Sequence, residues 1–298
     1  MKSFLRFLSC LLFISFSLLA NEKDVYINLP FKNPTKEMLL KMEKKVHHLP
    51  TVKNPGEMES FQHYLGAIDL IMLASQETPN CREFIKKYIF SDLPRFGTII
   101  DVGTGSGENT NFIAQKFEDV TLIDPEKKAL DSLGFTDLQD CKQLTKIKAT
   151  FQKSNLSNKK ADLIVFAHVF YEIPQDEWIS VIKKAYKSLV PGGIIFIVFN
   201  QGGSRDNFIH HFKPSHKFSF HTFQRNLKTI FPSSEIFISR EHIQTKSLEA
   251  MLQLCNLFLF DSKVKIVKED LTHYIHKYFQ ENDGFKASMD QVFIKIKK

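Results

Sequence analysis

The chain has 298 residues, which is enough for one large hydrophobic core or for one core with a cap. Hydrophobic residues make up 43%, and 29 phenylalanines against 12 glycines and 11 prolines exclude a largely disordered chain. The net charge of +7 comes from scattered basic residues without a long basic run, which favours a solvated surface over a nucleic-acid-binding stretch.

The first 20 residues have the pattern of a secretory signal peptide. Basic residues precede an apolar stretch, residues 7–19, and Ala20 supplies a small residue at the cleavage point. The stretch is short for a membrane span. We therefore expect an exported protein, periplasmic or secreted. Leu18 fits the cleavage motif poorly, so an uncleaved segment, leaving a cytoplasmic or membrane-anchored protein, is the alternative.

Residues 21–94 are expected to form an N-terminal arm followed by helices. The first part of this segment is charged and rich in proline, which indicates an extended arm with one short helix over 35–46. Apolar residues near helical spacing predict a second helix within 57–73 and a third helix over 80–89.

The segment 98–109, TIIDVGTGSGEN, is an apolar run that ends in Asp101 and in alternate glycines, Gly103, Gly105 and Gly107. Such a run predicts a buried strand that turns sharply into a helix, because glycines allow positive φ and close approach of a ligand. A dinucleotide-binding loop needs G-x-G-x-x-G, but the last position of that frame is glutamate here. A carboxylate at this helix N-terminus would repel a pyrophosphate.

Three further apolar runs, 119–124, 161–166 and 189–199, predict buried strands separated by helical segments. Strands alternating with helices predict an α/β fold with a parallel sheet covered on both faces. The first run ends in Asp124, and an acid there is placed to accept hydrogen bonds from both hydroxyls of a ribose. Beyond residue 222 the pattern predicts three more helices and two more strands, the last over 291–296.

The sequence AHVFYE, residues 167–172, follows the predicted strand over 161–166. Ligands of this fold bind outside the carboxyl ends of the strands, so His168 and Tyr171 are candidate catalytic residues. His168 could act as a general base near working pH, hydrogen-bond the substrate, or line the core.

Four histidines lie among phenylalanines within residues 200–222. Their spacing fits neither H-E-x-x-H nor a zinc finger, and we expect no metal site. An aromatic lid fits the composition better, in which Phe208 and Phe212 offer a cation–π face to an amine or a sulfonium of a bound substrate or cofactor.

The acid and G-x-G-x-G of residues 101–107, the acid-ending run 119–124 and the order "DLI, helix, LVPGG, strand" over 161–199 resemble the class I S-adenosylmethionine (SAM) methyltransferases. The resemblance covers about residues 95–200. It implies a Rossmann-like seven-stranded methyltransferase sheet with helices on both faces and a helical substrate cap. It also implies SAM as the cofactor.

The same resemblance implies cofactor contacts. The glycine loop would lie against the amino-acid part of SAM, with Asp101 orienting the loop and the ligand's amino group. Ser154 would contact the adenine amino group, and Ala167 would pack near the ligand. The methyltransferase domain would span 95–298, with a cap insert over about 240–288.

A closer resemblance, to histamine N-methyltransferase and its relatives, is seen in Glu59-Ser60-Phe61 and in Glu77 with the residues that follow it. It implies that the N-terminal helices form a lid over the substrate and that Glu77 binds the substrate's amine, a charge-assisted pair. The alternative is that Glu77 is an ordinary surface acid. His168 stands where that family has a glutamine, which argues against histamine itself.

These patterns predict an enzyme that transfers methyl from SAM to a small molecule, with an amine or imidazole nitrogen as the first choice of acceptor. The alternatives are an O-methyltransferase of a small acceptor and an exported SAM-fold interaction protein without catalysis. The N/D-P-P-Y/F motif of nucleic-acid methyltransferases is absent, so no nucleic-acid partner is expected. We expect a monomer that meets a membrane only through its N-terminal segment.

Overall fold

The computed structural model describes residues 25–26, 34–105, 107–132, 138, 141–214, 219–260 and 264–298, and all structural statements below concern these residues. The predicted signal peptide lies outside them. None of the helices in this part of the chain is long and apolar enough to cross a membrane.

The core of the molecule is a sheet with the strand order β1-β7-β9-β6-β5-β2-β3-β4, in which β8 also pairs with β9. The strands from β4 to β6 are mutually parallel, and β9 is antiparallel to both of its long neighbours. The predicted seven-stranded sheet is therefore confirmed, with the two-residue strands β1 and β8 added to it. The strands are β1 (Val25–Tyr26), β2 (Thr98–Val102), β3 (Asp119–Asp124), β4 (Gln143–Lys148), β5 (Ala161–Ala167), β6 (Leu189–Gln201), β7 (Glu235–Thr245), β8 (Gln280–Glu281) and β9 (Gly284–Lys297).

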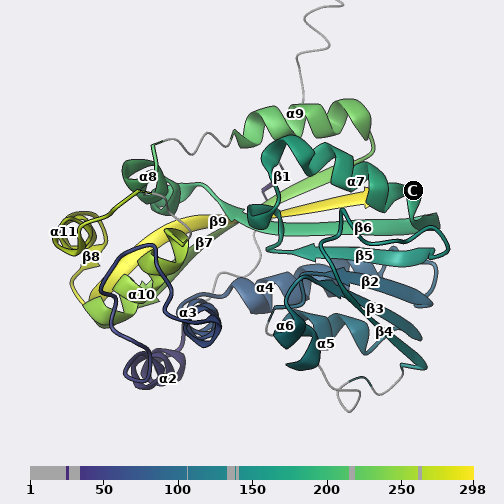
Figure 1. Ribbon diagram of the computed structural model, residues 1–298. Helices are drawn as coiled ribbons and strands as arrows, with labels where there is room; N and C mark the ends of the chain where they lie inside the picture. Colours follow the sequence, from purple (N-terminus) through teal and green to yellow (C-terminus); the bar gives the residue numbers. More distant parts are fainter. Residues whose placement is uncertain are drawn as a thin grey trace, which may run out of the picture.

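Helices cover both faces of the sheet, as the alternating pattern predicted (Figure 1). One face carries α7 and α9, and the other carries α4, α5 and α6. The helices are α2 (Lys36–Val46), α3 (Phe61–Ala74), α4 (Glu77–Phe84) with the π-helical η1 (Ile85–Phe90), α5 (Glu108–Ala114), α6 (Lys127–Ser132), η3 (Phe170–Glu172), η4 (Gln175–Glu177), α7 (Trp178–Lys187), α8 (Gly203–Phe212), α9 (Phe220–Ile230), α10 (Leu248–Phe258) and α11 (Lys268–Tyr278).

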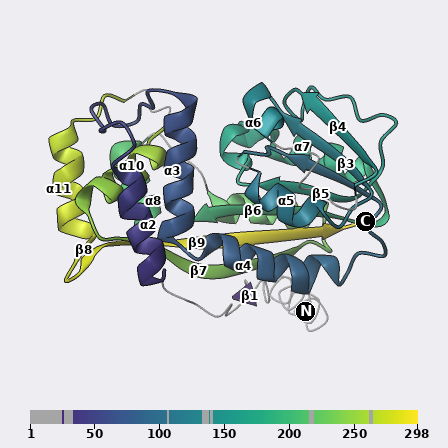
Figure 2. The same ribbon diagram turned by 90° about the horizontal axis from the view of Figure 1, so that it is seen from below.

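A cap of helices α2, α3, α8, α10 and α11 lies to one side of the sheet (Figure 2). These helices share a hydrophobic cluster of their own with the far ends of β7 and β9. The two strands pair without a break from Glu235 opposite Lys295 to Thr245 opposite Phe285. One long ribbon therefore belongs to the main sheet at one end and to the cap at the other, which fixes the cap against the sheet.

Helix α4 joins the cap to the sheet through Phe84, which is fully buried. Its ring stacks on Phe293 of β9 with 4.3 Å between centroids and meets Phe237 of β7 edge-on at 5.1 Å. Such aromatic contacts add to the free energy gained by removing each ring from water. Phe84 therefore sets how the first residues of α4 lie over the sheet.

We predict that Phe84→Ala lowers the free energy of unfolding by about 3–5 kcal/mol, because a large ring leaves a cavity under α4. Denaturant unfolding measures this loss. Leu40→Ala on α2 is the control, since Leu40 is 63% exposed, and a change within about 0.5 kcal/mol is expected there. Equal, small losses in both variants would contradict the anchoring role of Phe84.

Candidate cofactor and acceptor site

The predicted site residues gather at the carboxyl ends of the parallel strands. From β2 the chain moves outward to β3 and β4, then returns to β5 on the other side of β2. A crevice for a ligand forms at such a reversal of strand order. The loops after β2, β3 and β5 therefore lie together at the carboxyl ends of the strands, although they are far apart in sequence.

The glycine loop has the backbone that its sequence predicted. Gly103, Gly105 and Gly107 have φ values of +72°, +51° and +82°, a region that residues with a side chain rarely adopt. The Gly103 N–H donates to the carbonyl of Ile123 at 2.8 Å, and a Cβ at Gly103 would collide with Val169. The loop is thus folded tightly between the ends of β3 and β5.

Asp101 lies beneath this loop, buried, and accepts a hydrogen bond from the Thr110 hydroxyl at 2.5 Å. Burial raises the pKa of its carboxyl to about 6. Thr110 is on α5, so this bond ties the end of β2 to the helix that follows the loop.

Asp124 is the last residue of β3, and its carboxylate is buried at the same carboxyl end of the sheet. Its Oδ1 accepts from the Glu126 backbone N–H at 2.8 Å, and its Oδ2 accepts from the Thr104 hydroxyl at 3.4 Å. These contacts hold the carboxylate beside the glycine loop. Thr104 has no motif signal apart from its place between the glycines, and the sequence analysis missed it.

Tyr64 of α3 is a second residue that the sequence analysis missed. Burial raises the pKa of its phenol to about 12, and the negative charges of Glu172 and Asp124 add to this. Its ring packs against Phe260 at 5.3 Å. The cap helix α3 therefore brings a phenol to the edge where β3 ends, a proximity that no local pattern indicates.

Buried Glu77 and partly exposed His168 form a pair at the end of β5. Glu77 is the first residue of α4 and is only 7% exposed, so the surface alternative does not hold. Its Oε1 lies 2.6 Å from Nε2 of His168. Burial alone would raise the pKa of the Glu77 carboxyl, but the His168 imidazole, the neighbouring Asn200 amide and the positive charge of Arg205 outweigh burial and hold that pKa below its ordinary value.

The backbone of His168 is unusual. Among the described residues it is the one non-glycine with positive φ, +58°, and its N–H donates to the Val198 carbonyl at 2.8 Å. A non-glycine residue pays about 1 kcal/mol or more for this conformation. Strain of this kind is concentrated at functional sites, and here it turns the imidazole toward Glu77.

Tyr171 lies next to the pair on η3. Its hydroxyl hydrogen-bonds the backbone of Asn200 on β6, while its ring keeps 45% of its surface exposed. Burial of the hydroxyl raises the Tyr171 pKa, so the phenol stays neutral at working pH. The guanidinium of Arg205 lies over this ring, 5.7 Å from its centroid. Tyr171 therefore shapes the site and does not supply a base.

The remaining predicted residues are placed differently. Ala167 ends β5 beside His168, and the Ser154 hydroxyl donates to the Phe151 carbonyl at 2.7 Å, which leaves its oxygen able to accept a hydrogen bond. Phe208 and Phe212 are buried in the cap core, with Phe208 5.4 Å from the ring of Tyr274. The structure therefore does not bring these two rings to Glu77 and His168.

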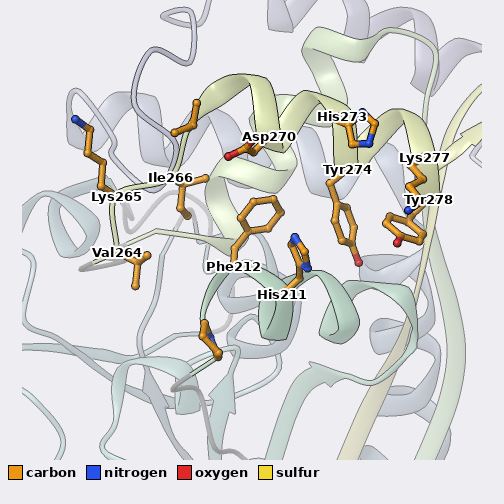
Figure 3. A pocket seen from close by; sticks show the side chains of 12 residues that line it. His211, Phe212, Val264, Lys265, Ile266, Asp270, His273, Tyr274, Lys277 and Tyr278 are labelled. Atoms are coloured by element: carbon orange, nitrogen blue, oxygen red, sulfur yellow. The ribbon is translucent and has the colours of Figure 1, made fainter.

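An open groove of about 480 Å³ lies elsewhere, between α8 and α11 of the cap (Figure 3). It is lined by residues that include His211, Phe212, Tyr274 and Tyr278. None of the site residues at the carboxyl ends of β2, β3 and β5 lines this groove, so it is not the site described above. Within the described ranges no group of three or more His, Cys, Asp or Glu side chains could hold a metal ion.

The lowered pKa of Glu77 predicts how acid affects stability. As pH falls, the unfolded chain takes up the proton first, near the ordinary value of 4.5, so the contribution of ionised Glu77 is complete above that pH and is lost as pH drops through the folded pKa. Glu77→Gln should flatten this loss in unfolding measured between about pH 5 and 3. Glu83→Gln, an exposed acid of the same helix, should leave the slope unchanged; identical slopes in wild type and Glu77→Gln would contradict the assignment.

Comparison with known proteins gives the family. A sequence model described as "Methyltransferase domain" matches residues 73–258, more than half of the chain. A candidate methyltransferase from Bacillus halodurans C-125 is 15% identical with a TM-score of 0.53, the match covering 72% of this chain and 99% of that one. YcgJ from Bacillus subtilis is 12% identical with a TM-score of 0.54, covering 72% and 98%.

The N-methyltransferase NodS from Bradyrhizobium japonicum WM9, in complex with S-adenosylhomocysteine (SAH), is 14% identical with a TM-score of 0.40, covering 88% of this chain and 98% of that one. No curated protein matches the sequence. Given the matched domain, the strand order and the glycine loop with Asp124, the chain belongs to the methyltransferase domain family, in the class I fold whose cofactor is S-adenosylmethionine.

Proposed function

We propose that the protein transfers the methyl group of SAM to a nitrogen of a small molecule, an amine or an imidazole, and that His168 accepts the proton that this nitrogen loses. The observation that carries this proposal is the pair of buried Glu77 and partly exposed His168 at the end of β5. A histidine held by a carboxylate is a common proton acceptor near neutral pH.

The residues at the carboxyl ends of β2 and β3 are suited to bind SAM. Asp124 offers two carboxylate oxygens beside the glycine loop, and a Cβ at Gly105 would point into open space, so the loop leaves room for a ligand there. Asp124 would hold the ribose hydroxyls, and the loop from Gly103 to Gly107 would lie against the amino-acid part. When bound, SAM supplies a methyl group on a sulfonium that a nucleophile can displace.

The contact between Glu77 and His168 supports one tautomer of the neutral imidazole. Because a carboxylate oxygen only accepts, with Oε1 of Glu77 at Nε2 the neutral ring would carry its proton on Nε2 and its lone pair on Nδ1. Nδ1 can therefore take the acceptor's proton, and the Glu77 carboxylate then stabilises the imidazolium. An uncharged nitrogen is thereby kept ready for methylation. Glu77 acts through His168 and is a positioning residue.

Two alternatives differ in chemistry. His168 could serve a phenol equally well, which would make the protein an O-methyltransferase. A carboxylate acceptor is disfavoured, because the buried Glu77 and Glu241 would repel it. We also propose that residues 1–20 direct export of the protein. The second alternative is an exported protein that binds SAM but methylates no acceptor.

Asp124→Ala should weaken SAM binding at least about a hundredfold, since two hydrogen bonds to a carboxylate are worth about 1.5–3 kcal/mol each. Titration calorimetry measures this. Asp119→Ala is the matched control, because Asp119 lies at the opposite end of the same strand. SAM binding that is equal in the two variants would contradict the placement of the cofactor.

His168→Asn should lower kcat about a hundredfold with SAM affinity unchanged, as expected when a general base is lost. Asparagine tolerates the positive φ at this position, so the backbone is kept. Transfer of labelled methyl is measured for imidazole, alkylamine, phenol and benzoate acceptors.

Methylation of nitrogen acceptors, and a smaller loss in Glu77→Gln that Glu83→Gln does not share, would support the proposal. Methylation of phenol alone would favour the O-methyltransferase. SAM binding with no transfer to any of these acceptors would favour a protein without catalysis.

A further inference from the structure

The face of the sheet beneath α4 changes from aromatic to polar within one row of residues. Phe84 covers the aromatic part, where Phe237 and Phe293 are cross-strand partners. One step further along the strands, the corresponding row is polar and buried. It consists of Asn200 on β6, Gln291 on β9 and Ser239 on β7, which are cross-strand partners.

Glu241 continues this polar row into the cap. It follows Ser239 on the same face of β7 and is 3% exposed. Its Oε1 accepts from the Asn80 side-chain amide and from the Ser239 hydroxyl at 3.2 Å. Its Oε2 has no hydrogen-bond partner among the residues that the structure describes. Both available donors thus serve one oxygen and leave the other unpaired.

The same imbalance extends over the cluster formed by Glu77, Asn200, Glu241 and Gln291, which we call the polar cluster. All four side chains are at most 7% exposed. Within the described part of the chain, their unpartnered atoms are four acceptors and one donor. They are Oε2 of Glu77, Oδ1 of Asn200, Oε2 of Glu241, and both Oε1 and Nε2 of Gln291. Buried polar atoms are rarely left unpaired, and this surplus of acceptors calls for a ligand rich in donors.

Charge gives the same indication. Burial raises the pKa of the Glu241 carboxyl to about 7, and the negative charges of Glu77 and Asp290 raise it further, against the hydrogen bonds from Asn80 and Ser239. Glu77 already has His168 and the positive charge of Arg205 nearby, whereas the groups that act on Glu241 are two hydrogen-bond donors and two acids, so Glu241 is the carboxylate that gains from a cation. Its unpartnered Oε2 accepts hydrogen bonds, so a cation that donates them, such as an ammonium, fits this position.

The side chains that connect His168 to Glu241 differ in exposure. His168, whose side chain is 27% exposed, contacts Glu77, whereas Glu241 is 3% exposed. Glu77 and Asn80 lie on the same face of α4, three residues apart, and the Asn80 side-chain amide donates to Glu241. A molecule with one nitrogen at His168 and its far end at Glu241 would therefore lie along this face of α4.

We propose that the methyl acceptor carries a second cationic, hydrogen-bond-donating group, an ammonium or an amidinium, which binds at Glu241 with Asn80 and Gln291 while the nitrogen to be methylated lies at His168. This inference rests on the proposed function. It narrows the acceptor to diamines and related dications and makes Glu241 a specificity-determining residue.

Calorimetry with 1,4-diaminobutane and 1-aminobutane at pH 8, with and without SAH, tests this proposal. The wild-type protein should bind the diamine at least about tenfold more tightly than the monoamine, the equivalent of one charge-assisted hydrogen bond. Glu241→Gln should remove this preference, and Glu281→Gln, an exposed acid on β8, should keep it. Equal affinity for the two amines in the wild type, or a preference that survives in Glu241→Gln, would overturn the proposal.

A folding defect is separated from loss of the subsite by a second variant. Gln291→Leu removes two unpartnered atoms and keeps the buried shape, so its unfolding temperature should equal or exceed that of the wild type. Glu241→Gln should behave likewise at pH 8, because it removes a buried charge. The diamine preference should nevertheless be absent in both. A preference retained by folded Gln291→Leu would count against the role of Gln291 and overturn the subsite as drawn.

The two proposals fail in different ways. If SAH binds and the wild type does not prefer the diamine, the subsite is wrong while the methyltransferase function stands. If a preference that depends on Glu241 is seen in a protein that binds no SAH, the subsite is supported and the methyl-transfer function is overturned.

Discussion

The carboxylate of Glu77 is the constraint around which the site is built. A buried acid must find a partner or lose its charge, and Glu77 is buried at the first residue of α4. Its partner, His168, reaches it from the end of β5 by adopting a left-handed backbone. The pair therefore links the cap side of the molecule to the strand edge where the glycine loop and Asp124 lie.

Strands β7 and β9 run through both the sheet and the cap and fix the position of one against the other. Phe84 packs α4 against the aromatic face of these strands. As a result, Ser239, Glu241 and Gln291, which lie next to the Phe237–Phe293 pair on the same face, are beneath the first turn of α4. The family supplies the chemistry of methyl transfer at the carboxyl ends of the parallel strands, and α4 with the strands β7 and β9 supplies the groups that would select the acceptor.

The sequence was most informative where the signal is local. The glycine loop, the acids that end β2 and β3, and the alternation of strands and helices each depend on neighbouring residues, and the structure has them as predicted. The residues that α3 and α4 bring to the site are different. Asn80 of α4 meets Glu241 across 161 positions, and Tyr64 of α3 lies near enough to Asp124 of β3 for that charge to raise the Tyr64 pKa, so neither proximity leaves a local pattern.

The aromatic residues of α8 also show that a local pattern does not reveal which part of the fold a side chain contacts. Phe208 and Phe212 suggested a cation–π face, but helical spacing does not say which core a helical face packs against, and the cap core takes both rings. The resemblance to histamine N-methyltransferase gave Glu77 as an amine ligand, and the structure adds that Oε1 of Glu77 contacts His168 while its Oε2 has no partner among the described residues. The identity of the acceptor stays a prediction that depends on this pair.

The most direct measurement of the central claim is the protonation state of His168 by nitrogen-15 NMR at pH 8, with the signals assigned by their loss in His168→Asn. The account predicts that the neutral ring carries its proton on Nε2, held there by Glu77, and has a free lone pair on Nδ1. A neutral ring that carries its proton on Nδ1 would contradict the claim that this pair is arranged to accept a proton from the substrate.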